Sequence, residues 1–439
     1  MIQRVARLLP HGALILLGLG LSAALFVTAK LDGDSVQILA KAIRLHDTGH
    51  FTHHGNTASV VGFVPGSFLT AVTAGPMLLW FSPYAALAVI ALLHLLALGA
   101  LASALRDLGR PAVGLDLVPI FWLNPWRLES LQLNSPAYLV PFAALHLWTA
   151  YRMRERSFGL SLLHALGVGF CAQVHYSFAI LALLSLVLWR FRFMAVHGGG
   201  VALASLVVLA SLVPYLVEYW RAPELEIRLA RSGSAFVGRN LLLVYPLAKA
   251  LAHWVRFGST CFPRPIFSEI DFAWLGDGPA RRVAGLAFAV TAWPLAGLTL
   301  LASLALNVRA LGGVLGARPF DRTVDRTLLR PAGRLAHYAF YMLAAMLGAV
   351  ALSPVGMVHW HLLVCFPAVA VLTTLAFNGL RERLSRRAFA SCFAAGLVVF
   401  AAFGALAALG SEHHALGADF DETLRALHRS LAAPERPGR

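Results

Sequence analysis

Two aspartates follow the first long apolar segment of the chain, in the stretch 31–35 of sequence LDGDS. An amphipathic helix pattern comes directly after them, which places both carboxylates at a membrane surface, where ionisable groups are usually functional. A carboxylate can accept the proton that an attacking hydroxyl or amine loses. Asp34 is therefore the candidate general base and Asp32 a candidate helper. The structural alternative is that Asp34 and Gln37 form a capping box and that Asp32 is simply solvated.

Three more polar residues lie in the loop after this helix pattern. His53, His54 and Asn56 could bind a sugar or a metal ion, although adjacent histidines in a polar loop are more often just exposed. The four cysteines are scattered singly, so the sequence contains neither a disulfide framework nor a zinc-binding spacing.

The composition places the chain in a bilayer. Of its 439 residues, 59% are hydrophobic and only 13% are charged, with a mean hydropathy of +0.71. The sequence predicts an all-α polytopic membrane domain over residues 1–410 and a C-terminal tail over 411–439. Apolar runs of helix length predict about eleven spans, near 10–30, 83–105, 112–126, 136–151, 159–174, 175–191, 198–217, 283–307, 335–354, 357–379 and 388–410.

The net charge of +15 comes from short arginine clusters between apolar runs, so it indicates topology and not nucleic-acid binding. The clusters fall at every second turn of the chain, and the positive-inside rule makes these turns and the N-terminus cytoplasmic. The loops 31–82 and 218–282 then lie outside. Within them, amphipathic patterns predict a helix over 36–49, flat on the membrane, and another over 241–257. The apolar piece 66–81 is short for a span, so an interfacial helix competes with a crossing, and the interfacial helix keeps every arginine cluster inside.

Several short motifs occur in a recognisable order. They are Gly33-Asp34-Ser35 with Ala42, Arg44, Leu45 and Thr48-Gly49, then Val64-Pro65-Gly66, Phe81-Ser82-Pro83, Asn124-Pro125-Trp126, Asn134-Ser135-Pro136, Gln173-Val174-His175-Tyr176-Ser177, Val213-Pro214-Tyr215-Leu216, and His361 to Pro367. This order resembles the C-type glycosyltransferase superfamily, in particular the branch of aminoarabinose transferases and protein O-mannosyltransferases. Each motif alone is weak, and the resemblance covers mainly the first half of the chain.

The resemblance implies a function. The protein would move a sugar from a polyprenyl-phosphate carrier to a lipid, glycan or protein acceptor at the outer face of a bacterial inner membrane, with Asp34 as the catalytic carboxylate. A phosphate needs cations where water is scarce. The candidate donor-binding residues are Lys41, Arg44, Arg127, His175, Tyr176, Arg239, Arg256 and His361. Lys41 and Arg44 could instead extend to lipid headgroups, and His361 could be structural.

The sequence departs from the family pattern at two places that matter for metal binding. Ser35 replaces the second acidic residue, and no carboxylate precedes Pro65, where metal-associated members carry one. Hard divalent cations prefer several oxygen ligands, so we expect transfer without a metal. A bound metal would be zinc on His53 or His54 rather than magnesium.

Two other functions share this scaffold. One is a non-catalytic flippase or transporter for lipid-linked sugars, which charges at mid-span or related halves would favour. The other is a polymerase or ligase for surface polysaccharide, which uses the same type of donor. Neither the sugar nor the acceptor is specified by the sequence.

Overall fold

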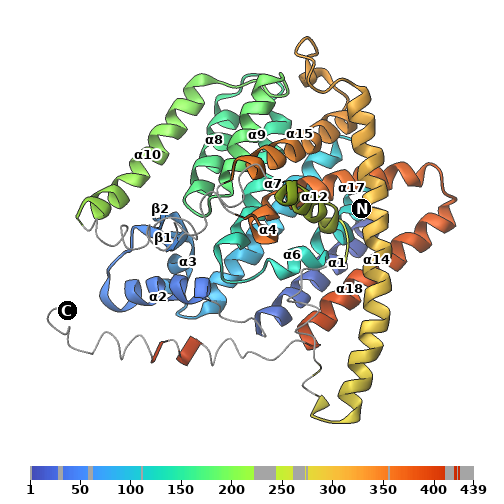
Figure 1. Cartoon of the computed structure of the whole chain (residues 1–439), viewed down its shortest axis with the longest axis horizontal. Coiled ribbons are helices and arrows are strands. Elements are labelled where there is room, and N and C mark those ends of the chain that lie inside the picture. The colour runs from blue at the N-terminus through green and yellow to red at the C-terminus, as the bar shows by residue number, and fades with distance from the viewer. Residues whose placement is uncertain are drawn as a thin grey trace.

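The computed structural model describes residues 2–27, 33–57, 63–109, 112–221, 244–260, 272, 275–353, 356–410, 420–422 and 424–425. Within these residues the protein is helical apart from one two-stranded hairpin (Figure 1). The prediction of an all-α polytopic membrane architecture is confirmed.

The longer helices are α1 (Ile2–Val27), α2 (Gly33–Thr48), α3 (Phe68–Leu79), α4 (Pro83–Arg106), α7 (Leu139–Arg152), α8 (Phe158–Ala172), α9 (Phe178–Arg190), α10 (Gly198–Arg221), α12 (Val244–Phe257), α14 (Pro279–Gly316), α15 (Pro331–Leu352), α17 (Phe366–Arg381) and α18 (Arg386–Gly410). The short elements are β1 (His54–Thr57), β2 (Phe63–Pro65), α5 (Ala112–Leu117), the π-helix η1 (Val118–Trp122), α6 (Pro125–Glu129), the 3-10 helices η2 (Ser135–Tyr138), η4 (Arg326–Leu328) and η5 (Leu363–Cys365), and α16 (His359–Leu362).

Five of the described helical segments are long and apolar enough to cross a membrane: α4, α10, α14, α15 and the run His359–Arg381. Shorter apolar helices include α8 and α9. The count of about eleven spans therefore stays a prediction. The helices predicted within 31–82 and 218–282 are present as α2, α3 and α12.

The predicted helix over 112–126 is wrong at its C-terminal end. The chain changes from α5 to the π-helix η1, where Pro119 has no N–H for the helical ladder. Asn124 then starts a new helix, because its side chain accepts a hydrogen bond of 2.9 Å from the backbone N–H of Trp126. Asn134 caps η2 in the same way, through the N–H of Ala137 at 3.1 Å. Both Asn-containing motifs are thus helix starts.

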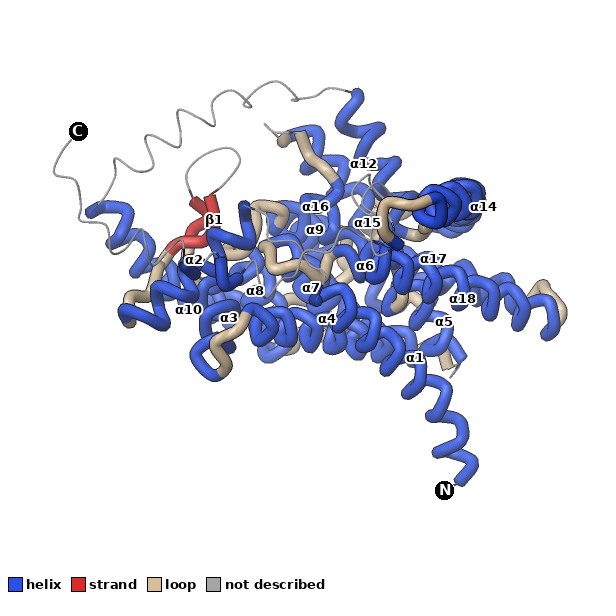
Figure 2. Tube along the Cα trace, turned by 90° about the horizontal axis from the view of Figure 1, so that it is seen from below, coloured by secondary structure: helices blue, strands red, loops and turns tan. Residues whose placement is uncertain are grey.

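The core lies around α4, α7 and α17, whose facing side chains are buried. On one side, α8 packs between α7 and α10, while α9 packs against α15. The helix α14 lies along the opposite side of the molecule from the hairpin in both views (Figures 1 and 2). It has 38 residues, so at 1.5 Å per residue it is about 57 Å long and exceeds the predicted span.

The described parts of the loop 31–82 fold as a compact unit. The helix α2 buries Ile38, Leu39, Ala42 and Ile43, and it packs against α3 and β1. The hairpin is antiparallel, with His54 opposite Pro65 and Thr57 opposite Phe63. Figure 2 shows it at one end of the molecule. This unit carries most of the residues predicted to form the site.

Candidate functional site

The hairpin is bonded to α2 by side chains of the helix. The Lys41 ammonium donates to the carbonyl oxygen of Gly55 at 2.5 Å and to Oδ1 of Asn56 at 3.4 Å. Asn56 is buried, and its Nδ2 donates to the backbone oxygen of Asp34 at 3.1 Å. These bonds place β1 directly beside the first turn of α2, where Asp34 lies.

Gln37 is also engaged with the hairpin. Its Oε1 accepts hydrogen bonds from the N–H of Thr57 at 2.9 Å and from the Thr57 hydroxyl at 3.0 Å. A capping box would need the same oxygen at the N-terminus of the helix. The capping-box interpretation of Asp34 and Gln37 therefore does not describe this helix. Asp34 is instead an acidic residue in the first turn, where the helix dipole favours a negative charge.

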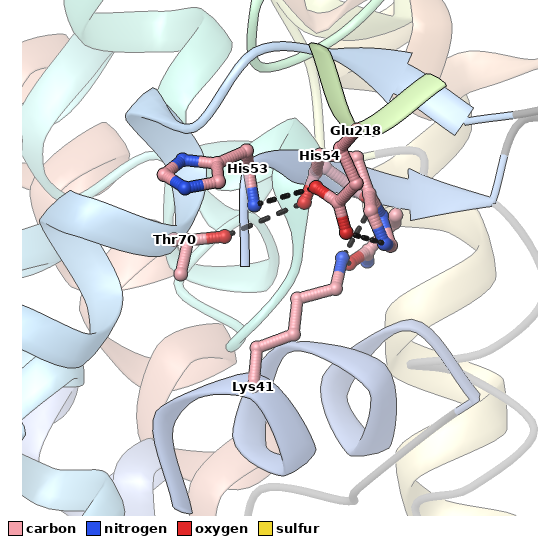
Figure 3. Close-up of polar contacts among 7 residues, drawn as sticks. Lys41, His53, His54, Thr70 and Glu218 are labelled. Carbon is pink, nitrogen blue, oxygen red and sulfur yellow. Dashed lines mark hydrogen bonds and ion pairs between the residues drawn. The ribbon is translucent and has the colours of Figure 1, made fainter. Parts of the chain in front are cut away.

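A second carboxylate reaches the site from α10. Glu218 extends from the outer end of that helix to the segment His53–His54 (Figure 3). Its Oε2 accepts a hydrogen bond of 3.3 Å from the backbone N–H of His53, and its Oε1 lies 3.9 Å from Nε2 of His54. Glu218 is not among the site residues predicted from the sequence, because the apolar run of this span ends at 217 and Glu218 then falls in the loop 218–282. An acidic residue at the outer end of a span, as at Asp34, is the signal that could have found it.

Lys41 lies in the field of both carboxylates. Burial lowers the pKa of its ammonium to about 8, while Asp34 and, to a smaller extent, Glu218 raise it. Figure 3 shows the side chain directed from α2 toward the hairpin. The alternative that Lys41 extends to lipid headgroups is therefore wrong, because its ammonium is held by protein oxygens. Arg44, on the same helix, is exposed.

The turn 173–177 connects the hairpin to the rest of the outer surface. Gly66 has φ +89°, and a Cβ atom there would lie 2.3 Å from Oε1 of Gln173, so both the backbone conformation and the contact require glycine. The amide of Gln173 in turn donates to Oγ of Ser211 on α10 at 2.6 Å. Tyr176 donates through its hydroxyl to the carbonyl of Phe63 at 3.2 Å. The Pro-Gly and Gln-x-His motifs thus meet in space.

Histidine and tryptophan rings continue from this turn toward α12. The ring centres of His175 and His361 are 5.3 Å apart, and the ring centres of His359 and Trp126 are 5.9 Å apart. The Arg256 guanidinium lies 5.6 Å from the centre of the Trp126 ring. We call His175, His253, His359, His361, Trp126 and Trp360 the histidine–tryptophan cluster.

Backbone hydrogen bonds fix two of the imidazole rings in this cluster. Nδ1 of His175 accepts from the N–H of Ser177, and Nδ1 of His361 accepts from the N–H of Val358, both at 3.1 Å. In each neutral ring the proton is then on Nε2, which is a hydrogen-bond donor. The sequence analysis did not place His253 or His359 at the site.

Arg127 does not belong to this surface. Its side chain is completely buried, donates to the carbonyl of Trp122 and to Oγ of Ser22 at 3.4 Å, and lies 3.9 Å from the centre of the Trp122 ring. The prediction that Arg127 binds the donor phosphate is therefore wrong, since this arginine holds η1 against α1. Asp32 and Arg239 lie outside the described residues.

The described residues contain no group of three or more His, Cys, Asp and Glu side chains that could hold a metal ion. Glu218 adds one oxygen ligand beside His54, which the sequence did not indicate. Transfer without a metal stays a prediction.

No protein-family model and no curated protein matches the sequence. The structure is similar to ArnT from Cupriavidus metallidurans bound to undecaprenyl phosphate, with a TM-score of 0.50, 13% identity, and coverage of 97% of this chain and 78% of that chain. The apo structure of the same enzyme gives a TM-score of 0.53 at 14% identity, covering 97% and 76%. The chain therefore shares the fold of this ArnT, as the order of its motifs predicts.

Proposed function

We propose that the protein is a glycosyltransferase that moves a sugar from a polyprenyl-phosphate carrier to an acceptor at the outer face of a bacterial inner membrane. The observation that carries the proposal is that Asn56 bonds both Lys41 and the backbone oxygen of Asp34, which holds the hairpin over these two residues of α2 in a chain with the fold of ArnT. The ArnT structure with undecaprenyl phosphate supports a carrier of this chemical class.

In the proposed reaction Asp34 accepts the proton of the acceptor hydroxyl or amine. The acceptor atom attacks the anomeric carbon while the bond from that carbon to the carrier phosphate breaks. The phosphate oxygen keeps the bonding electron pair and leaves on the opposite face, so the configuration at the anomeric carbon inverts. Lys41 provides a positive charge near Asp34, which favours the ionised carboxylate before the proton is transferred.

The carrier phosphate is proposed to bind at the histidine–tryptophan cluster. Arg256 supplies a cation there, and His175 and His361 present Nε2–H donors. The Tyr176 hydroxyl bonds Phe63 of the hairpin, and the neighbouring His175 belongs to the cluster. The turn 173–177 therefore links the cluster to the unit that carries Asp34. The lipid tail would lie among the apolar helices. A cavity of about 670 Å³ between α8, α9 and α10, lined mostly by apolar side chains, provides room for an isoprenoid chain.

Reconstitution tests the proposal. Purified protein in liposomes receives a lipid extract from cells fed with radiolabelled sugars, and the label is followed from the carrier into products. We expect label to leave the carrier with the intact chain but not with Asp34→Asn, while both proteins retain undecaprenyl phosphate in native mass spectrometry. Label that crosses the bilayer while still attached to its carrier would contradict the proposal and identify a flippase. A polymerase or ligase would be recognised by a product of polysaccharide length.

A further inference from the structure

We infer that Glu218 is a positioning residue of the transfer site, which joins the outer end of α10 to the first outer loop and keeps Lys41 beside Asp34. The inference rests on the proposed function and names a residue that the motif order does not contain. Glu218 is 165 residues from its hydrogen-bond partner His53 in the sequence, so only the fold brings the two together.

The geometry shows how Glu218 can act. Its two carboxylate oxygens contact two successive residues where β1 begins. One accepts from the N–H of His53 at 3.3 Å, and the other lies 3.9 Å from the imidazole of His54. His54 also packs on Phe63 of the facing strand, with ring centres 4.0 Å apart. The carboxylate thus holds the open end of the hairpin, while Lys41 holds the next two residues of β1, Gly55 and Asn56, from below (Figure 3).

The helix α10 needs such a connection at its outer end. Most of its side chains are exposed, which in this fold means that they face lipid, and it packs mainly on α8. Toward its C-terminal end, its hydrogen bonds to other segments include the Gln173–Ser211 bond and the bond from the N–H of His53 to Glu218, beside which His54 lies. Movement of α10 away from the hairpin would therefore separate Glu218 from the loop that carries Lys41.

The charges around Lys41 make the role measurable. The ionisable groups around Lys41 are Asp34 of α2, Glu218 of α10 and His54 of β1. The helix α3, which packs against α2, contains no ionisable residue. Both carboxylates raise the pKa of Lys41 against the effect of burial, which by itself lowers it. Removal of the Glu218 charge should lower that pKa below its value of about 8, and Lys41 would then lose its proton at a lower pH.

The experiment measures Lys41 directly and transfer separately. The full-length protein is acetylated with acetic anhydride over about pH 6 to about pH 10, and mass spectrometry gives the midpoint for Lys41, which reports its pKa without any activity. We expect Glu218→Gln to move this midpoint down by about one pH unit, and Glu218→Asp to leave it closer to that of the wild type. Glu155→Gln, on the exposed inner loop, is the matched control and should not move it.

Transfer is then measured over the same pH range. Because the protonated Lys41 holds the hairpin, activity should fall as Lys41 loses its proton. At pH 8 a midpoint lowered by about one unit reduces the protonated fraction, so Glu218→Gln should be about fivefold less active than Glu155→Gln. In Lys41→Arg the basic limb should disappear, because arginine stays protonated. Adding Glu218→Gln to Lys41→Arg should cause no further pH shift.

Changing the charge at residue 218 after the protein has folded makes the test independent of whether a variant folds. Glu218→Cys, in a chain with its native cysteines replaced by serine, is folded first and then reacted with an anionic or a cationic thiosulfonate reagent. The anionic adduct should restore the Lys41 midpoint and transfer, and the cationic adduct should not. Equal midpoints for the two adducts, or a Glu218→Gln protein with the wild-type pH profile, would overturn the inference. If the wild-type chain transfers nothing while Glu218→Gln still lowers the Lys41 midpoint, the proposed function alone is refuted.

Discussion

Replacement of Asp34 by asparagine separates catalysis from structure most directly. Asparagine has nearly the same size, and the bond from Asn56 to residue 34 uses the backbone oxygen, so the hairpin keeps its anchor. The structural loss is the charge in the first turn of α2, which contributes about 0.3–1 kcal/mol through the helix dipole. That loss changes a folding equilibrium by about fivefold at most. Lys41 would also lose its larger stabilising neighbour, which lowers its pKa further below about 8.

The catalytic loss is expected to be much larger. Removal of a general base lowers a rate by about a hundredfold or more, which corresponds to about 2.7 kcal/mol. The assay is transfer of radiolabelled sugar by equal amounts of monodisperse protein, with thermal unfolding measured in parallel. Asp47→Asn, at the exposed end of the same helix, is the matched control and should retain activity. Wild-type transfer by the Asp34→Asn protein would refute the role of Asp34.

Three further predictions follow from particular contacts. Gly66→Ala should destabilise the fold by about 1–3 kcal/mol and lower Tm, because φ is +89° and the new Cβ would meet Gln173 at 2.3 Å, whereas Gly75→Ala on α3, where nothing lies within 4 Å, should not. Cysteines placed at the exposed positions His50 and Glu155, in a chain without other cysteines, should react with impermeant reagents from opposite sides of the membrane, and labelling from one side would contradict the topology. Transfer should continue in excess EDTA; loss that magnesium or manganese alone reverses would show that the site has metal ligands beyond those identified.

Local signals explain which parts of the fold the sequence predicts well. Apolar runs are long enough to identify α4, α8, α9 and α10 within a few residues. The periodicity of 36–49 predicts the burial of Leu39 and Ile43 on α2, but Val36 is exposed and Lys41 is bonded to the hairpin. These patterns depend on neighbours within one or two turns. The break after α5 was missed because a π-helix preserves the apolar composition of the run and changes only its backbone hydrogen bonds.

The sequence by itself therefore determined the membrane architecture, the helices of the first outer loop and Asp34 as the leading candidate base. Tertiary structure alone decided which ionisable side chains share a site. The sequence predicts Arg127 and Lys41 alike as donor-binding basic residues, but packing buries Arg127 against Trp122 and directs Lys41 to the hairpin. Glu218 joins them only because α10 ends beside His53. Such proximities depend on how distant segments pack, and the pattern of neighbouring residues in a sequence does not encode this.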